Sequence, residues 1–216
     1  MIEEMRSGPY EVATLFDGSS LEHWSHADGS PAGWVLDEDE GCMTVAPRAG
    51  NILSDERHED CFLHLEFRCP DMPEAEGQHK GNSGVYLQGR YEIQVLDSYG
   101  WETPGLGDCG AIYNQHAPLV NACRPPEQWQ SYDVIFRAPR LDEQGQIVEC
   151  ARMTLLLNGL VIHNNIVLTG PTGGHLDENI GEPGVVMLQD HGDVVSYRNI
   201  WLVHLPAQGA QQYEPA

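Results

Sequence analysis

Large polar side chains recur at alternate positions of four strand-like segments. They are Tyr86 and Gln88, Glu92 and Gln94, Gln189 and His191, and Ser196 and Arg198. Successive residues of a strand point to opposite faces of its sheet, so each pair shares one face, opposite its neighbours. Such amide, imidazole, guanidinium and carboxylate groups hydrogen-bond hydroxyl groups with defined geometry. The segments therefore predict a polar face suited to a sugar, although an ordinary solvent-exposed sheet face is an equally good interpretation of the alternation alone.

Two carboxylates could act together on a glycosidic bond. Glu92 and Asp97 lie in the segment YEIQVLDS, and their spacing places them on opposite faces of a regular strand. A β-bulge between them would bring both to one face. Paired carboxylates that flank a sugar bond can serve as acid and base or as nucleophile. The spacing alone is a weak indication of a glycosidase.

The chain is strongly acidic. It has 11 Lys and Arg residues against 33 Asp and Glu residues, which gives a formal net charge of -22 at pH 7. Such a surface repels phosphate backbones, so nucleic acid is not expected as a partner. The sequence also has no run of roughly 18 apolar residues, the length that a membrane helix needs, so no membrane partner is expected. Solubility is the simplest explanation of the charge, to which a neutral sugar is indifferent.

The compartment is inferred from the first residues and from the cysteines. The segment MIEEMRSGPYEVATLF lacks the cationic start and apolar stretch of a signal peptide. We therefore expect a cytoplasmic protein, or an exported one whose leader has already been removed. The six cysteines form no CxxC pair, which argues against a zinc knuckle or a thioredoxin motif. Cys109 and Cys123 lie in one long loop and could pair if the protein is exported.

Short strand-like segments dominate the chain, and helical periodicity is almost absent. The predicted strands are Gly33–Asp37, Cys42–Ala46, Cys61–Cys69, Gly84–Leu87, Tyr91–Leu96, Gln130–Ala138, Arg152–Leu157, Leu160–Val167, Gly184–Gln189 and Val194–His204. Asn158-Gly159 between two of them predicts a type I′ hairpin. On the last strand, alternation places Tyr197, Asn199 and Trp201 on the core side. The pattern predicts an all-β fold, a sandwich or a barrel, formed by a single domain over residues 1–216.

Three long loops interrupt the strands, at Pro70–Asn82, Tyr99–Gln128 and Thr169–Pro183. Loops of this length inside a compact domain are usually lids or binding loops. The second carries aromatic and amide side chains in place of a solvating charge run, and we expect it to contact the ligand. Trp101 is the candidate platform for a sugar ring, and Tyr113 and Asn121 are candidates to shape the site.

A set of motifs in a fixed order resembles one family. The motifs are LFDGSSLEHW (15–24), NSGVYLQGRYEIQVLDS (82–98), GAIYNQHAP (110–118), EQWQSYDVIF (127–136), LLLNGLVIHNN (155–165) and PGVVMLQDHGDVVSYRNIWLVHL (183–205). Together they resemble the 3-keto-disaccharide hydrolase family, also described as 3-keto-glucoside lyase/hydratase domains, over roughly residues 14–205. The resemblance implies a two-sheet antiparallel jelly-roll sandwich of the concanavalin-like type, with its core at roughly 14–205 and long loops over its concave face. It also implies a 3-keto-glycoside as substrate.

The implied chemistry starts from the ketone at C3, which makes the C2 hydrogen acidic. A base removes that proton, the C1 substituent leaves, and water adds back, so that the net result is hydrolysis. His191 is the first candidate base because imidazole titrates near neutral pH. Glu92 is the rival base, Arg198 would stabilise the oxyanion, and Asp97 would orient His191 or Arg198.

The remaining predicted groups bind substrate or metal. The substrate-binding candidates are Asn82, Tyr86, Gln88, Gln94, Trp101, Tyr113, Asn121 and Gln189. Glu92, Gln94 and His191 would provide mixed oxygen and nitrogen ligands for a divalent metal such as Mg, Mn, Ca or Zn. No organic cofactor is expected.

Two other functions stay open on the sequence. A retaining glycosidase would use Glu92 and Asp97 and would need no C3 ketone. A non-catalytic sugar-binding module would depend more on Trp101 and Tyr113 than on His191. Structural roles are also open, because His191 could be a turn residue and Arg198 could form an ion pair with Glu92.

Overall fold

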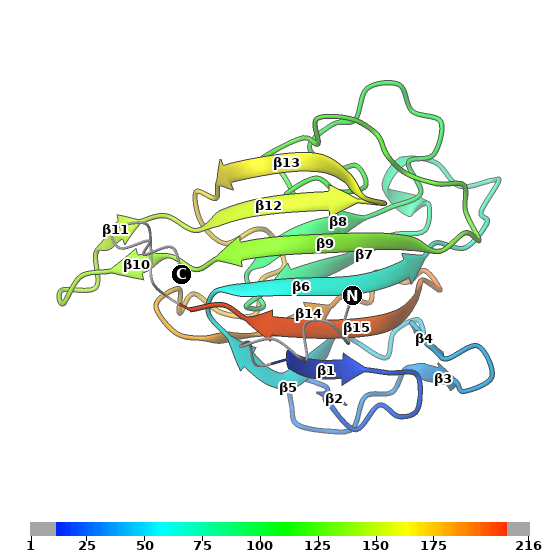
Figure 1. Ribbon diagram of the computed structural model, residues 1–216. Coiled ribbons are helices and arrows are strands. Elements are labelled where there is room, and N and C mark those ends of the chain that lie inside the picture. Colours follow the sequence, from blue (N-terminus) through cyan, green and yellow to red (C-terminus); the bar gives the residue numbers. More distant parts are fainter. Residues whose placement is uncertain (1–11, 207–216) are drawn as a thin grey trace, which may run out of the picture.

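The computed structural model describes residues 12–206, which form two packed antiparallel sheets and a small hairpin (Figure 1). The larger sheet has the order β13 (Leu160–Val167), β12 (Arg152–Leu157), β9 (Gln130–Arg137), β6 (Cys61–Arg68), β15 (Ser196–His204), β4 (Cys42–Thr44) and β3 (Val35–Asp37), and β1 (Val12–Phe16) also pairs with β15. The smaller sheet has the order β2 (Trp24–Ser25), β5 (Ile52–His58), β14 (Gly184–Leu188), β7 (Ser83–Leu87) and β8 (Tyr91–Val95). β10 (Arg140–Leu141) pairs with β11 (Ile147–Glu149). The predicted all-β sandwich is confirmed.

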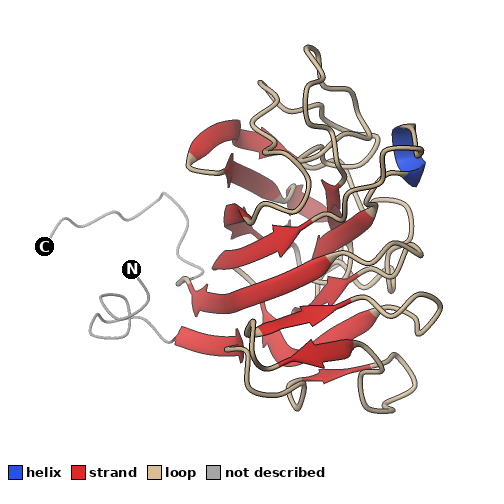
Figure 2. Cartoon of the chain, turned by 90° about the vertical axis from the view of Figure 1, so that its right-hand side faces the viewer, coloured by secondary structure: helices blue, strands red, loops and turns tan. Residues whose placement is uncertain are grey.

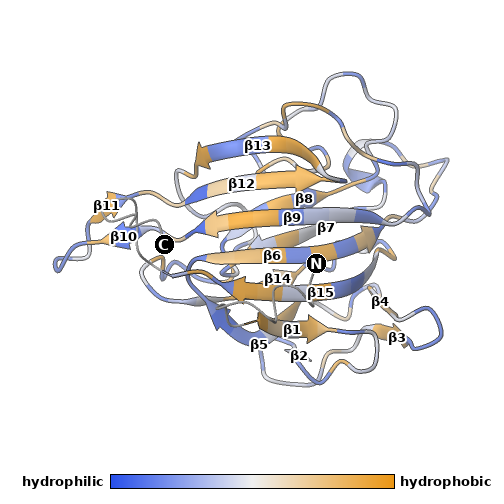
Figure 3. Cartoon of the chain, in the orientation of Figure 1, coloured by the Kyte–Doolittle hydropathy of each residue, from blue (hydrophilic) through white to orange (hydrophobic). Residues whose placement is uncertain are grey.

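The strands form because apolar residues alternate along them. In β6 the burial alternates residue by residue, and Leu63, Leu65 and Phe67 are fully buried. Val85 and Ile93 of the smaller sheet belong to the same core, which fills the space between the two sheets. Apolar colouring is concentrated on the strands, whereas the loops are mainly polar (Figure 3). This one-sided burial fixes which side chains of β7 and β8 point away from the core.

Every strand predicted from the sequence is present, and the strands that were missed have identifiable reasons. β5 has the sequence ILSDERH, whose charged residues conceal its alternation. The remaining missed strands, β1, β2, β10 and β11, are five residues long or shorter. Asn158 and Gly159 both have positive φ angles, 54° and 79°, as a type I′ hairpin turn requires.

A β-bulge interrupts β15 and overturns one prediction. The pairing with β6 shifts between Arg198 and Trp201, and Asn199 adopts a φ of 49°. Asn199 is therefore exposed, although alternation placed it on the core side. After the bulge the faces are exchanged, so Ile200 joins the core while Trp201 stacks on His64 of the outer face, with ring centroids 5.0 Å apart.

Two buried tyrosines tie the larger sheet to β7 and β8. Tyr132 of β9 donates its hydroxyl proton to the Gln94 carbonyl oxygen at 2.6 Å, and Tyr197 of β15 bonds the Ser83 hydroxyl at 2.7 Å. These bonds hold the two strands that present the candidate site in a fixed position across the core.

The short helix η1 (Gly77–His79) and long loops lie on one side of the strands (Figure 2). Lys80 attaches the first loop to the end of β8, because its ammonium lies 3.1 Å from Asp97 Oδ2 and its carbonyl accepts the Asp97 N–H at 2.9 Å. Within residues 12–206 no helix is long and apolar enough to cross a membrane.

Candidate functional site

A polar pocket of about 220 Å³ lies on the face of the smaller sheet that points away from the core. It is lined by Gln78, Asn82, Tyr86, Glu92, Gln94, Tyr113, Gly173, Gly174, Gln189 and His191. The lining thus combines β7, β8 and the end of β14 with all three long loops. Tyr86 and Glu92 are opposite each other in the register of β7 and β8, as are Gly84 and Gln94. The alternation of these strands is what places Tyr86, Glu92 and Gln94 on one face.

Glu92 is the one carboxylate of this pocket, and it is only 3% exposed. Two loops hold its main chain: the Glu92 N–H donates to Thr172 Oγ1 at 2.8 Å, and its carbonyl accepts the Tyr113 N–H at 3.2 Å. Burial raises the pKa of Glu92 to about 7, and a hydrogen bond from Tyr86 opposes the rise. A carboxyl group that titrates near neutral pH can serve as a general base or acid.

Side-chain amides form the wall beside Glu92. Gln94 donates its Nε2 to Gln78 Oε1 at 2.9 Å, and Asn82 donates its Nδ2 to the Gln78 carbonyl at 2.7 Å. Gln189 donates its Nε2 to the Tyr86 hydroxyl at 3.1 Å. The amide oxygens of Asn82, Gln94 and Gln189 are buried and accept no hydrogen bond from the described residues. Buried acceptors in this state match a ligand that brings several hydroxyl donors.

Tyr86 stands between the amides and Glu92. Its hydroxyl donates to the Gly173 carbonyl at 3.0 Å and is fully buried. Burial, with Glu92 nearby, raises the pKa of Tyr86 above its ordinary value. The phenol therefore stays protonated and remains a hydrogen-bond donor at neutral pH.

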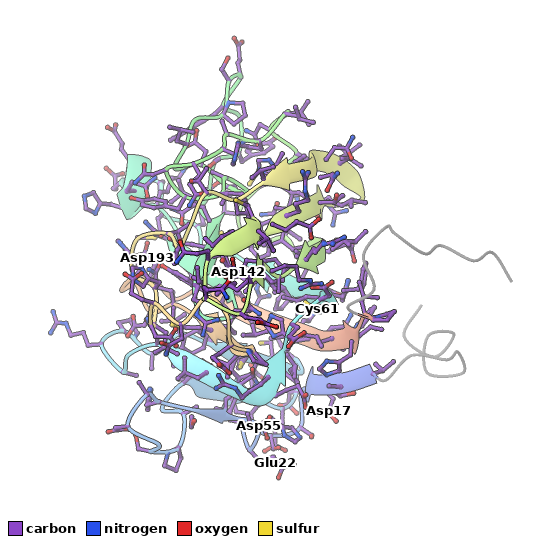
Figure 4. All side chains as sticks on the ribbon, turned by 90° about the vertical axis from the view of Figure 1, so that its left-hand side faces the viewer. Asp17, Glu22, Asp55, Cys61, Asp142 and Asp193 are labelled. Atoms are coloured by element: carbon purple, nitrogen blue, oxygen red, sulfur yellow. The ribbon has the colours of Figure 1, made fainter. Side chains whose placement is uncertain are left out.

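His191 lies at the mouth of the pocket, where it is exposed. It belongs to the link between β14 and β15, which also carries Asp193 (Figure 4). Asp193 Oδ2 accepts the Asn82 N–H at 2.8 Å, so this link is joined to the start of β7. The structure thus separates the two predicted bases, with Glu92 inside the pocket and His191 at its entrance.

Arg198 lies outside the pocket, contrary to the role predicted for it. It belongs to the other sheet and points to that sheet's outer face, where its Nε bonds Glu66 Oε2 at 2.7 Å. Its guanidinium also lies 4.1 Å from the ring centroid of Trp129. Arg198 does form an ion pair, as the alternative interpretation expected, but its partner is Glu66 and not Glu92.

Asp97 also lies outside the pocket lining. β7 and β8 pair without a register shift from Tyr91 to Val95, so β8 contains no bulge, and Asp97 lies beyond the end of the strand. The Asp97 carboxylate is buried against Lys80, at the point where the first loop is attached. The carboxylate pair that a retaining glycosidase would need is therefore not assembled here.

Two predicted substrate contacts serve the scaffold, and a third lies outside the pocket lining. Gln88 lies in the turn after β7 and donates its Nε2 to the His58 carbonyl at 3.0 Å, near a different pocket. Asn121 donates its Nδ2 to the carbonyls of Ser98 and Trp101, at 2.7 and 2.9 Å, and so fastens the second loop. Trp101 is 38% exposed and is not part of the pocket lining.

The predicted metal ligands Glu92, Gln94 and His191 all line the pocket. They combine one carboxylate, one amide and one imidazole, and no group of three or more His, Cys, Asp and Glu side chains within residues 12–206 could hold a metal ion. A divalent cation prefers several oxygen or imidazole ligands at once. A metal at this place would need the Gln94 amide oxygen as a ligand. It remains a prediction, and every step below uses the side chains of the chain itself.

Sequence reasoning missed Gln78, Gly173 and Gly174. Gln78 lies in the first loop, and no periodicity could place it beside Gln94. The two glycines carried a usable signal, since Gly174 adopts a φ of 74° and a Cβ there would lie 2.8 Å from the Tyr86 hydroxyl oxygen. Adjacent glycines in a long loop often mark such a close approach.

Comparison with known proteins gives a family match and several similar solved structures. Residues 11–203 match the family described as a 3-keto-alpha-glucoside-1,2-lyase-like domain. A candidate glycosyl hydrolase of known structure from Parabacteroides distasonis ATCC 8503 is 36% identical, with a TM-score of 0.82 over 90% of this chain and 84% of that chain. No protein of curated function matches the chain significantly.

More distant structures share the fold alone. A second candidate glycosyl hydrolase from the same organism is 19% identical, with a TM-score of 0.69 over 95% of this chain and 98% of that chain. The Crh5 transglycosylase, solved in complex with NAG, is 15% identical, with a TM-score of 0.50 over 92% of this chain and 84% of that chain.

Proposed function

Because this chain belongs to the 3-keto-alpha-glucoside-1,2-lyase-like family, we propose that it cleaves 3-keto-glycosides by elimination followed by hydration. The family assignment makes it a carbohydrate-active domain. The reaction within that class is inferred from the pocket. The observation that carries the proposal is a single buried carboxylate, Glu92, whose pKa is raised to about 7 and which faces buried amide oxygens.

In the first step Glu92 removes the C2 proton of the keto-sugar. As the proton leaves, negative charge develops on the C3 oxygen, which becomes enolate-like. The electrons of the C2–H bond then form the C1–C2 double bond, and the bond from C1 to the aglycone oxygen breaks. The products are an aglycone alcohol and a 2-hydroxyglycal that keeps its C3 ketone. A base with a pKa near the working pH suits this proton transfer, because it is ionised and still basic.

Tyr86 is suited to stabilise the developing enolate. Its phenol stays protonated because burial raises its pKa, and it adjoins Glu92 on the neighbouring strand. Its one hydroxyl proton, which the Gly173 carbonyl accepts in the free site, would turn to the C3 oxygen when the sugar is bound. A neutral donor in a site shielded from water stabilises such a charge without prior reorganisation. The oxygens of Asn82, Gln94 and Gln189 would accept the sugar hydroxyls and fix the ring above Glu92.

His191 would serve the leaving group. Its exposed position at the mouth places it where the aglycone must leave the pocket. An imidazole in that place can donate a proton to the departing oxygen. In the hydration step Glu92 returns its proton to C2, and the oxygen of a water molecule bonds to C1 while His191 accepts the proton that this water releases. Both side chains thus regain their starting states, and the net change is addition of one water across the glycosidic bond.

The test is turnover of a 3-keto-glucoside beside its unoxidised parent, each with and without EDTA. The proposal predicts cleavage of the keto-sugar only. Equal cleavage of the parent would overturn it in favour of a direct glycosidase, and binding of the keto-sugar without cleavage would indicate a sugar-binding module. Loss of cleavage with EDTA, restored by one added cation, would establish the divalent metal that the sequence predicted.

A further inference from the structure

The Thr169–Pro183 loop is attached to the smaller sheet through one buried arginine. Arg90 lies in the turn between β7 and β8, and its side chain is fully buried. Its Nε donates to Asp177 Oδ1 at 2.7 Å, and its Nη1 donates to the Glu182 carbonyl at 2.8 Å. The hydrogen bond from Arg90 lowers the pKa of the Asp177 carboxyl group, so Asp177 is ionised at neutral pH.

The main chain beside Arg90 adds a second set of attachments. The Thr172 N–H and the Thr172 hydroxyl both donate to the Arg90 carbonyl, at 2.8 and 3.1 Å. The Leu176 N–H donates to the Gly89 carbonyl at 2.8 Å. The segment between these anchors is Gly173-Gly174, which lines the pocket. The loop is therefore bound at several points around the position where it meets the site.

The anchored segment touches the proposed catalytic groups directly. Thr172 Oγ1 accepts the Glu92 N–H at 2.8 Å, and the Gly173 carbonyl accepts the Tyr86 hydroxyl at 3.0 Å. Gly174 approaches so closely that a Cβ would lie 2.8 Å from the Tyr86 hydroxyl oxygen. Movement of this segment away from the sheet would open the pocket at Tyr86 and admit water to Glu92.

We propose that Arg90 is a positioning residue of this site, which holds Thr172, Gly173 and Gly174 closed over Tyr86 and Glu92 and so excludes water from the pocket. The inference rests on the proposed role of Glu92 as the base. Around Glu92, the titratable groups of the pocket lining are Tyr86 of β7, Tyr113 of the second loop and His191 of the β14–β15 link. No lysine or arginine belongs to that lining within the described residues, so Arg90 acts through the loop and not by direct contact.

The substitution Arg90→Met separates the two ways in which an arginine could act. Loss of a nearby cation would raise the pKa of Glu92, because an opposite charge favours the ionised carboxylate. Opening of the loop would lower it, because burial is the main cause of its raised value. We expect the acid limb of the kcat/KM profile to move from about pH 7 to lower pH, with a fall in kcat/KM of about 10- to 100-fold.

Two further variants complete the experiment. Arg137→Met removes an arginine that pairs with Glu149 at 2.6 Å, outside the pocket lining, and should leave the profile unchanged. Asp177→Asn keeps Arg90 but weakens the attachment, and it should move the acid limb in the same direction by less. It also tests the inference if Arg90→Met does not fold. Arg90→Lys keeps one donor and the charge, and should restore part of the loss.

The pKa of Glu92 can also be read without turnover, by NMR titration of its ¹³C-labelled carboxyl group. A lower pKa in the folded Arg90→Met and Asp177→Asn proteins supports the inference, whatever the substrate is. An unchanged or raised pKa in both would overturn it. Failure of the proposed function would show differently, as a wild-type protein that cleaves no keto-sugar.

Discussion

The outer faces of the two sheets carry similar residue types in different states. On the larger sheet, Glu66 bonds Arg198 at 2.7 Å and Asn199 at 3.0 Å, and His64 bonds Asp133 at 2.7 Å. On the smaller sheet, Glu92 is more deeply buried and its neighbours in the pocket are neutral amides and tyrosines. Glu66 on the first face is paired with Arg198, whereas Glu92 on the second has no lysine or arginine beside it in the lining that the described residues form.

Residue composition alone therefore does not distinguish a catalytic face from a structural one. Glutamate, histidine, asparagine and tryptophan occur on both outer faces or on their loops. What differs is compensation: the larger sheet pairs its charges and stacks Arg198 and Arg68 on Trp129. The smaller sheet keeps a raised carboxyl pKa and buried amide oxygens without partners. Such uncompensated groups mark functional sites more often than paired ones do.

The largest expected effect on turnover comes from replacing one glutamate by glutamine, on the smaller sheet in one variant and on the larger sheet in the other. Glu92→Gln should lower the turnover of a 3-keto-glucoside by about 10²- to 10⁴-fold, the usual contribution of a general base. Glu66→Gln is the matched control and should keep turnover within about twofold of wild type, because general-base catalysis needs a group in the pocket. Steady-state kinetics of both variants measure this. Comparable losses in the two would remove the distinction between the faces.

Removal of the phenol from Tyr86 should have the next largest effect. Tyr86→Phe deletes the neutral donor assigned to the enolate, and we expect a fall in kcat of about 10²-fold. Tyr132→Phe is the control, because it deletes a buried hydroxyl that bonds the Gln94 carbonyl across the core. That variant should lose stability while keeping its kcat. A Tyr86→Phe enzyme with wild-type kcat would show that another donor meets the enolate.

The raised pKa of Glu92 should also appear in the stability of the protein. Between about pH 4.5 and pH 7 the folded state binds more protons at Glu92 than the unfolded state does, so the free energy of unfolding falls as the pH rises. Glutamine does not ionise, so the free energy of unfolding of Glu92→Gln should not fall in this way. At pH 8 it should exceed that of wild type by up to about 3 kcal/mol.

Urea denaturation at pH 5 and pH 8 measures this difference, which should shrink at the lower pH. Glu66→Gln should show no such gain, because it breaks an ion pair. If Glu92→Gln were less stable than wild type at pH 8 by the same amount as at pH 5, Glu92 would have an ordinary carboxyl pKa.

The smallest expected effect concerns Arg198. Its side chain is 35% exposed, so loss of the pair with Glu66 in Arg198→Met should cost only about 0.2–1 kcal/mol in the free energy of unfolding. Turnover should remain within about twofold of wild type. A large loss of turnover in a folded Arg198→Met protein would return this residue to the catalytic role that the sequence predicted.

The sequence was informative where a feature depends on local periodicity. Alternation identified the strands and placed Tyr86, Glu92 and Gln94 on one face, because burial of the opposite face fixes the orientation of a strand. It could not give the contacts that Arg198 and Asp97 make. Their partners, Glu66 and Lys80, belong to other segments, and charge pairing between such segments has no periodic signal. The bulge at Asn199 likewise follows from pairing with β6 and not from the residues of β15 alone.

The loops set the limit of prediction for the site. Tyr113 was found because aromatic residues are unusual in a solvating loop. Gln78 and Arg90 were missed. Gln78 reaches the pocket because Lys80 attaches its loop to β8. Arg90 bonds Asp177, which belongs to a loop far along the chain. Such contacts are set by tertiary packing, which a single sequence does not encode as a pattern.

The central claim is that Glu92 removes and returns the proton at C2, and cleavage in D₂O tests it most directly. Elimination and hydration place a solvent hydrogen at C2 once the proton on Glu92 has exchanged with D₂O, whereas direct displacement at C1 leaves the original hydrogen in place. NMR of the sugar product, corrected for exchange without enzyme, should show deuterium at C2 after each turnover. A product that retains its original C2 hydrogen, together with no kinetic isotope effect on cleavage of a C2-deuterated substrate, would contradict the account.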